Sequence, residues 1–175
     1  MSSRFERVAV EPKYEGKIFS VAEETFRHED GEDSTREIVR HQGAVGVVAH
    51  DGERIYLVRQ PREAVGAPDL LELPAGKLDV EGEEPLETAK RELAEEIGKT
   101  AERWEHLHSF YTSPGFTDEE CHVYLATGLS DAEAESDEHE RIDIEIRPLS
   151  ELDALIDEVR DSKTLIGLLE LRRRR

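Results

Sequence analysis

The strongest constraint on the fold comes from residues 73–98, which read LPAGKLDVEGEEPLETAKRELAEEIG. Pro85 suits the first position of a helix, and the acidic residues before it would lie at the positive end of the helix dipole. At about 100° per residue, one apolar stripe is formed by Leu86, Ala89, Leu93 and Ile97. The segment therefore predicts an amphipathic helix from about Pro85 to Ile97.

Two carboxylates lie at the border of this apolar stripe. Glu92 and Glu96 are one turn apart on the same flank, and such a pair repels by roughly 0.2–0.5 kcal/mol on an exposed helix and by more when desolvated. A divalent cation would offset the repulsion, and ligands made only of oxygen favour Mg²⁺ or Mn²⁺. A solvated face of Glu with Lys and Arg explains the spacing equally well, so the spacing alone leaves both readings open.

The segments around this helix predict a mixed fold. Alternating or apolar runs predict strands at residues 18–27, 35–41, 44–49, 54–59, 70–75, 104–111, 122–127 and 142–147. Two helices are expected at the end of the chain, with Ser150 and Ser162 as their N-caps. Strands around a central helix, followed by further helices, predict an α+β domain arranged as an α/β/α sandwich.

Composition excludes several classes of protein. The 175 residues are 37% hydrophobic, which suits one globular domain, and they contain no apolar run of about 18 residues that would span a membrane. The charged N-terminus lacks the apolar core of a signal peptide, and Cys121 has no second cysteine to pair with. We therefore expect a cytoplasmic protein.

The formal net charge of −19 bears on partners. Such a surface repels nucleic acid and anionic lipid, so neither is expected as a partner. A small anionic substrate would need local Arg, Lys or metal ions. The four arginines at residues 172–175 are expected at the C-terminal end of a helix, where cations are favourable, and a basic binding tail is the alternative.

A longer pattern surrounds the two carboxylates. Gly76 is followed by six residues, then Glu83, seven residues, and residues 91–98 with the sequence RELAEEIG. This pattern resembles the signature box of the Nudix hydrolases, in which the first spacer has five residues and an apolar residue follows the last glycine. Here the spacer is one residue longer and Lys99 takes the apolar position. The extra residue precedes the helix, so it alters the loop and leaves the carboxylate spacing intact.

Segments outside the box resemble the ADP-ribose pyrophosphatase branch of that family. They are residues 36–37 (RE), 43–45 (GAV), 58–62 (VRQPR), 71–76 (LELPAG) and 113–116 (SPGF). Pro114 lies 16 residues after Gly98, where a proline marks this branch. The resemblance implies a Nudix fold with a mixed sheet, one catalytic helix and C-terminal helices. It also implies Mg²⁺-dependent hydrolysis of ADP-ribose to AMP and ribose 5-phosphate.

The resemblance assigns a metal site for Mg²⁺, with Mn²⁺ as a substitute. Glu92 and Glu96 would be the principal ligands, with Glu95 adjacent and the carbonyl of Ala75 adding an oxygen. Glu83 would help at the outer shell of the metal or pair with Arg91. Arg91 would orient these carboxylates as an outer-shell partner, and the alternative is a plain surface ion pair.

A base must hold or deprotonate the attacking water. In the resembled branch this carboxylate comes from a late loop, here within residues 131–140. Glu140 is favoured by its place before the strand at 142–147, with Glu138 second. A helix residue such as Glu95 is the third candidate.

The resemblance also implies a substrate site and a homodimer. Arg62 matches a phosphate-binding arginine, while Arg36 and Glu37 match residues that hold the adenine end, often across a dimer. Phe19 would either stack on the base or pack in the core. The remaining substrate-binding candidates are Ser113, Pro114 and Gly115. We expect residues 1–42 to form a dimer-exchanging arm and residues 43–175 to form the Nudix domain.

Three alternatives stay open. The substrate could be another nucleoside diphosphate sugar such as GDP-mannose, because the catalytic helix is common to the family and only pocket residues differ. A catalytically silent Nudix domain that binds nucleotides is a second alternative, but it predicts the loss of a metal ligand, and Glu92, Glu95 and Glu96 are all present. An acidic metal-buffering protein would not explain the positions of Gly76 and Arg91.

Overall fold

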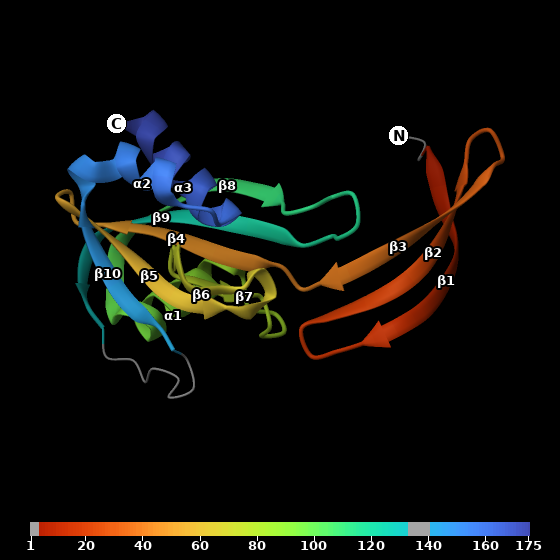
Figure 1. Ribbon diagram of the computed structural model, residues 1–175, viewed down its shortest axis with the longest axis horizontal. Coiled ribbons are helices and arrows are strands. Elements are labelled where there is room, and N and C mark those ends of the chain that lie inside the picture. Colours follow the sequence, from red (N-terminus) through yellow and green to blue (C-terminus); the bar gives the residue numbers. More distant parts are fainter. Residues whose placement is uncertain (1–3, 133–140) are drawn as a thin grey trace. The chain divides into compact units, whose positions relative to one another are not determined.

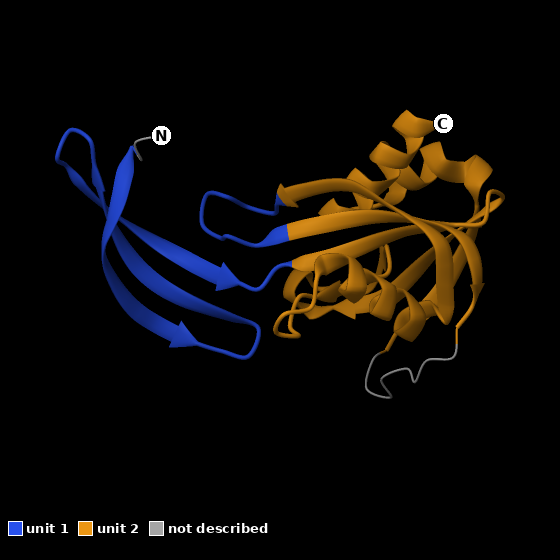
Figure 2. Ribbon diagram, turned by 180° about the vertical axis from the view of Figure 1, so that it is seen from behind, with its two compact units in different colours: residues 1–43, 111–120 blue, residues 44–110, 121–175 orange. Residues whose placement is uncertain are grey.

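The computed structural model describes residues 4–132 and 141–175, which form two compact units. The first unit comprises Met1–Gly43 and Tyr111–Glu120, and the second comprises Ala44–Phe110 and Cys121–Arg175 (Figure 2). The expected arm at residues 1–42 thus shares a unit with the later segment 111–120. The expected base candidates Glu138 and Glu140 lie outside the described residues.

The first unit contains a three-stranded antiparallel sheet with the order β1-β2-β3. Its strands are β1 (Phe5–Glu15), β2 (Phe19–His28) and β3 (Asp33–His41). The sequence predicted β2 and β3 but not β1, because every residue of β1 is exposed and its sequence does not alternate cleanly. As an edge strand, β1 is held by pairing with β2, which also explains why it tolerates Pro12.

A buried carboxylate organises the rest of the first unit. Glu24 is buried, and Arg40 binds both of its oxygens at 2.6 and 2.7 Å. Arg40 also donates to Asp118 at 2.9 Å, and the backbone N–H of His41 donates to the other oxygen of Asp118 at 2.9 Å. Charge-assisted hydrogen bonds of this kind are stronger than neutral ones, so they fasten residue 118 to β3.

The backbone of the segment 111–120 pairs with β3 as well. The N–H of Val39 donates to the Phe116 carbonyl at 2.8 Å, and the N–H of Asp118 donates to the Val39 carbonyl at 3.3 Å. Val39 and Thr117 form a parallel bridge. The segment that contains Ser113, Pro114 and Gly115 therefore belongs structurally with the N-terminal sheet.

The second unit is built on a seven-stranded mixed sheet (Figure 1). Its strands are β4 (Ala44–His50), β5 (Arg54–Arg62), β6 (Ala67–Glu72), β7 (Ala75–Lys77), β8 (Lys99–Tyr111), β9 (Glu120–Asp131) and β10 (Asp143–Pro148). The main order is β10-β5-β4-β9-β8, with β6 beside β5 and β7 beside β4. Only the β4–β9 pairing is parallel among the registers of the described strands.

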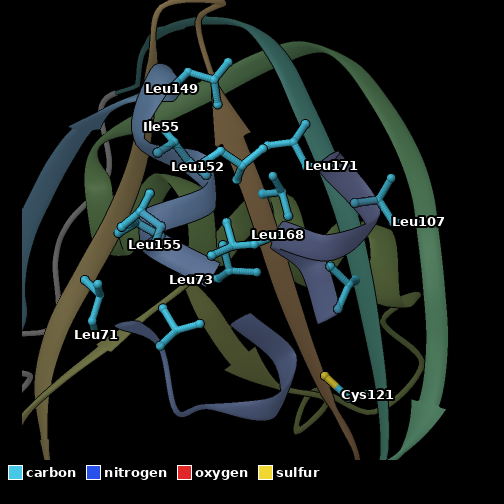
Figure 3. Packing of buried hydrophobic residues seen from close by; sticks show 14 residues of the cluster. Ile55, Leu71, Leu73, Leu107, Cys121, Leu149, Leu152, Leu155, Leu168 and Leu171 are labelled. Atoms are coloured by element: carbon cyan, nitrogen blue, oxygen red, sulfur yellow. The ribbon is translucent and has the colours of Figure 1, made fainter. Parts of the chain in front are cut away.

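Helices cover both faces of this sheet. The helices are α1 (Pro85–Ile97), α2 (Leu152–Glu158) and α3 (Ser162–Arg174). On one face, Ala89, Leu93 and Ile97 of α1 pack with Tyr56 and Val58 of β5. The alternate residues of β5 belong to the opposite core, which is closed by α2 and α3 (Figure 3) and includes Ile55, Leu57, Leu73, Leu155, Leu168 and Leu171. This arrangement confirms the predicted α+β fold class with α/β/α layers.

The two helix caps predicted at the end of the chain are wrong. Ser162 is the first helical residue of α3, and the cap is Asp161, whose side chain accepts from the N–H of Thr164 at 2.9 Å. Ser150 lies inside a 3₁₀ turn, η2 (Leu149–Glu151), that leads directly into α2. An aspartate one residue earlier competes well for a cap because it ranks with serine in N-cap preference.

The C-terminal arginines lie in the last turn of α3, as expected. Arg172 pairs with Asp153, while Arg173 and Arg174 pair with Glu170. These ion pairs give the tail a role within the fold. None of the helices in the described part of the chain has the length and apolar character needed to cross a membrane.

Candidate active site

The carboxylate of Glu92 packs directly on the backbone of β7. Glu92 is only 9% exposed, although its side chain is a carboxyl group. A Cβ atom added to Gly76 would lie 2.0 Å from both the carboxyl carbon and Oε1 of Glu92. Only glycine leaves room for a carboxylate this close to the strand, so the fixed glycine of the sequence pattern has a steric explanation.

Glu96 reaches the residue before that glycine. The backbone N–H of Ala75 donates to Glu96 Oε2 at 2.9 Å. Ala75 and Gly76 pair with Gly46 and Val45 of β4, which fixes β7 at the sheet. The structure therefore brings the predicted ligands Glu92, Glu96 and Ala75 to one place, where α1 faces β7.

Arg91 binds three carboxylates with one guanidinium group. Its Nη1 donates to Glu92 at 2.8 Å and to Glu95 at 3.0 Å, and its Nη2 donates to Glu83 at 3.2 Å. Burial alone would lower the pKa of Arg91, but its hydrogen bonds and these negative charges raise it above its ordinary value. Arg91 thus does more than form one surface ion pair, because it fixes three acidic side chains relative to one another.

Glu83 is held from two sides at the start of α1. Besides the bond from Arg91, it accepts a hydrogen bond from Thr88 Oγ1 at 2.8 Å. The hydrogen bonds from Arg91 and Thr88 lower the pKa of Glu83. Glu83 is therefore ionised at neutral pH and oriented toward Arg91, which fits an outer role at a metal site.

This group of carboxylates fits a divalent cation whose coordination is completed by a bound substrate. Among the described residues, no three His, Cys, Asp or Glu side chains are arranged to hold a metal by themselves. Glu92 and Glu96 instead lie against the Ala75–Gly76 backbone. The atoms there that could coordinate a metal are carboxylate and carbonyl oxygens. Mg²⁺ normally takes one or two protein carboxylates and fills its remaining positions with water and substrate phosphate.

Arg62 is bound to a buried acid at the end of β6. Its Nε and Nη2 donate to the two oxygens of Glu72 at 2.6 and 2.9 Å, and Glu72 is 1% exposed. Lys163 binds the same carboxylate and pairs with Asp161 at 3.0 Å. Burial would raise the pKa of Glu72, but Arg62 and Lys163 hold it below its ordinary value. This carboxylate is therefore charged and doubly paired.

Neither Glu72 nor Lys163 is predicted from the sequence as a site residue. Glu72 resembles any solvated acid in sequence, and its second cation lies 91 residues later. The available signal was its position between two leucines, since an acid that is buried with them needs a partner. The hydrogen bond to Glu72 is the main cause of the raised pKa of Arg62, and the negative charge of Glu96 adds a smaller contribution, so Arg62 lies within electrostatic reach of the acidic helix.

The other substrate-binding candidates lie in the first unit. Phe19 is 42% exposed and its ring lies 5.6 Å from that of Tyr14, so it does not pack in a core. Arg36 and Glu37 are exposed neighbours on β3, and Arg36 donates to the Thr35 carbonyl at 2.8 Å. All three side chains are accessible on the N-terminal sheet.

The loop at residues 113–116 is a tight turn. The Ser113 carbonyl accepts from the N–H groups of Phe116 and Thr117, both at 3.1 Å. Pro114 and Gly115 are exposed at its tip. The two hydrogen bonds therefore close the turn while its tip stays exposed.

A mixed sheet between helical layers, with an acidic helix packed against a glycine of a short strand, defines the class of Nudix folds. The chain belongs to the NUDIX domain family, whose model matches residues 40–167. It is similar to the ADP-ribose pyrophosphatase of Mycobacterium tuberculosis, with 45% identity over 80% of this chain and 68% of that protein. It is also similar to the methanol dehydrogenase activator of Bacillus methanolicus, with 43% identity over 92% of this chain and 89% of that protein.

A solved structure shares the fold. The crystal structure described as an ADP compounds hydrolase superposes with a TM-score of 0.85 and covers 98% of this chain and 94% of its own. The sequences are 21% identical, so this likeness concerns the fold.

Proposed function

We propose that this protein hydrolyses the pyrophosphate bond of ADP-ribose to give AMP and ribose 5-phosphate, in the cytoplasm and with Mg²⁺ as the metal. The observation that carries this proposal is the pair Glu92 and Glu96, held against the Ala75–Gly76 backbone of a Nudix fold. The similarity to a protein named ADP-ribose pyrophosphatase supports the choice of substrate.

Glu92, Glu96 and the Ala75 carbonyl would hold the metal, with Mn²⁺ as a substitute. When bound, such an ion neutralises developing charge on the phosphate and lowers the pKa of its water. Arg91 keeps Glu92, Glu95 and Glu83 in fixed positions through its three hydrogen-bonded carboxylates. The residues that touch the reaction are thereby oriented before substrate arrives, which avoids reorganisation during the reaction.

Arg62 would bind a substrate phosphate. Two of its guanidinium nitrogens bind Glu72, and its Nη1 makes no hydrogen bond with any residue in 4–132 or 141–175. A guanidinium held in one plane by a buried carboxylate can present its remaining N–H groups to a phosphate with little loss of side-chain entropy. Positive charge at this position is necessary in a protein with net charge −19.

The N-terminal unit would recognise the adenosine end and form a homodimer. Phe19, Arg36 and Glu37 are exposed there, as base stacking and polar recognition require. Large apolar side chains are exposed along β1 and just after it, namely Phe5, Val8, Val10, Tyr14 and Ile18. An apolar surface of this kind on an edge strand favours association with a second copy.

A product assay tests the proposal. Purified protein is incubated with Mg²⁺ and a panel of ADP-ribose, GDP-mannose and other nucleoside diphosphate sugars, and products are separated by chromatography. We expect AMP and ribose 5-phosphate from ADP-ribose, and Glu96→Gln should lower turnover by orders of magnitude while the fold is unchanged. Near-normal activity of Glu96→Gln would reject the metal site. Preference for GDP-mannose would keep the chemistry and change the substrate.

The water-activating base is tested by separate variants. We propose Glu140, with Glu138 and Glu95 as the alternatives. Glu140→Gln should lower turnover by more than about tenfold, because a general base normally contributes more than this. A smaller effect reassigns the role to whichever of Glu138→Gln and Glu95→Gln gives the larger loss.

A further inference from the structure

The three consecutive residues before Gly76 of β7 each form a backbone hydrogen bond with a different element. The N–H of Leu73 donates to Thr164 Oγ1 of α3 at 2.9 Å. The carbonyl of Pro74 accepts from the N–H of Val47 in β4 at 2.8 Å. The N–H of Ala75 donates to Glu96 of α1 at 2.9 Å. Helix α3 therefore contributes one of the three supports of the backbone that presents the Ala75 carbonyl.

The hydroxyl of Thr164 is fully engaged. Thr164 is 0% exposed, and its Oγ1 donates to Asp161 Oδ2 at 2.6 Å while it accepts from Leu73. Because the single hydroxyl proton is directed to Asp161, a lone pair is left for the N–H of Leu73. The capping of α3 explains the contact between Asp161 and the Thr164 backbone. It does not explain the bond to Leu73, which lies 91 residues earlier.

We infer that Thr164 is a positioning residue of the metal site, acting through Leu73 on Ala75 and Glu96; this inference rests on the proposed function of that site. Loss of the hydroxyl leaves the buried N–H of Leu73 without an acceptor, which is costly unless the segment moves. Any movement is passed to Ala75, only two residues on. Metal–ligand distances stay within about 0.2 Å of their preferred values. A small displacement of the Ala75 carbonyl therefore weakens metal binding.

The test measures Mn²⁺ binding to the full chain by electron paramagnetic resonance, in the presence of a non-hydrolysable ADP-ribose analogue whose phosphates can complete the coordination. Thr164→Val keeps the shape and removes the acceptor, while Thr164→Ser keeps the acceptor. We expect the Mn²⁺ dissociation constant to rise about tenfold in Thr164→Val, as for other residues that orient metal ligands, and to stay within about twofold of wild type in Thr164→Ser. If Thr164→Val does not fold, Thr164→Cys replaces it, because a thiol is a weak acceptor.

Leu171→Ala is the matched control for stability. Leu171 is buried on the same helix, two turns from Thr164, and belongs to the core under α3. This variant should lower the Tm at least as much as Thr164→Val and leave Mn²⁺ affinity unchanged. Equal loss of Mn²⁺ affinity in Leu171→Ala would overturn the inference, because general destabilisation would then account for the effect.

The remaining outcomes separate the inference from the proposed function. If wild type binds Mn²⁺, Glu96→Gln does not, and Thr164→Val matches wild type, the metal site stands and the role of Thr164 is refuted. If wild type itself fails to bind Mn²⁺, the proposed metal site fails, and the positioning role is rejected with it.

Discussion

Replacing Gly76 by alanine should disable the site without unfolding the protein. The added Cβ would lie 2.0 Å from the carboxyl carbon of Glu92, whereas carbon atoms in contact are about 3.5 Å apart, so the carboxylate must move by roughly 1.5 Å. Gly76 does not have a positive φ, so alanine adds no backbone strain. A displacement of about 1 Å costs about 100-fold in rate, equivalent to about 2.7 kcal/mol of barrier.

The assay is steady-state ADP-ribose hydrolysis over a range of Mg²⁺ concentrations, with the Tm measured in parallel. We expect kcat to fall about 100-fold in Gly76→Ala and the Tm to change little, since the atoms that must move are the end of one side chain and not backbone. Gly46→Ala is the control, because its Cβ would meet Lys163 and Leu73 at an ordinary 3.7 and 3.8 Å. If Gly76→Ala kept kcat within about threefold of wild type, the position of the Glu92 carboxylate would not matter and the steric argument would fail.

Three further predictions concern the charged groups. Arg91→Lys replaces the planar guanidinium, whose two terminal nitrogens bind three carboxylates, by a single nitrogen that cannot hold them in the same geometry. The Mg²⁺ concentration for half-maximal rate should therefore rise about 10-fold or more; an unchanged value would contradict the orienting role. Lys163→Met leaves Arg62 as the only cation on Glu72, so KM should rise about tenfold, or about 1.4 kcal/mol of binding, with kcat nearly constant. The pKa of Glu72 is lower in the folded state than its ordinary value of 4.5. The ionised Glu72 therefore stabilises the fold at pH values above 4.5, and this stabilisation is lost as the pH falls from 4.5 through the pKa of the folded state. Urea unfolding between about pH 3 and pH 6 should show that the free energy of unfolding falls less on acidification in Glu72→Gln than in wild type.

Helix α1 could be predicted from sequence because its signals are local. Pro85 and Gly98 bound α1 at the expected residues, and Gly98 has the left-handed conformation of a helix C-cap. Strand β1 could not be predicted, since all its residues are exposed and its stability comes from pairing with β2. Periodicity reports burial of one face, and β1 buries neither.

The residues of the candidate site likewise include some that could be predicted from sequence and some that could not. Glu92 and Glu96 follow from spacing on one helix, and Gly76 from the pattern around it. Glu72 and Thr164 do not, because each matters through a contact across 91 residues. A buried acid and a buried threonine have no periodic signature, and only the fold shows what they hold.

The attachment of residues 111–120 to β3 has a consequence for inheritance and for protein engineering. The exposed turn at Pro114 and the side chains of Arg36 and Glu37 would be carried over together whenever the first unit is exchanged with that of a relative. A chimera that transplanted only residues 1–43 would separate Val39 from Phe116 and Arg40 from Asp118. Both stretches have to be grafted together if the pairing between residues 111–120 and β3 is to be kept in the recipient.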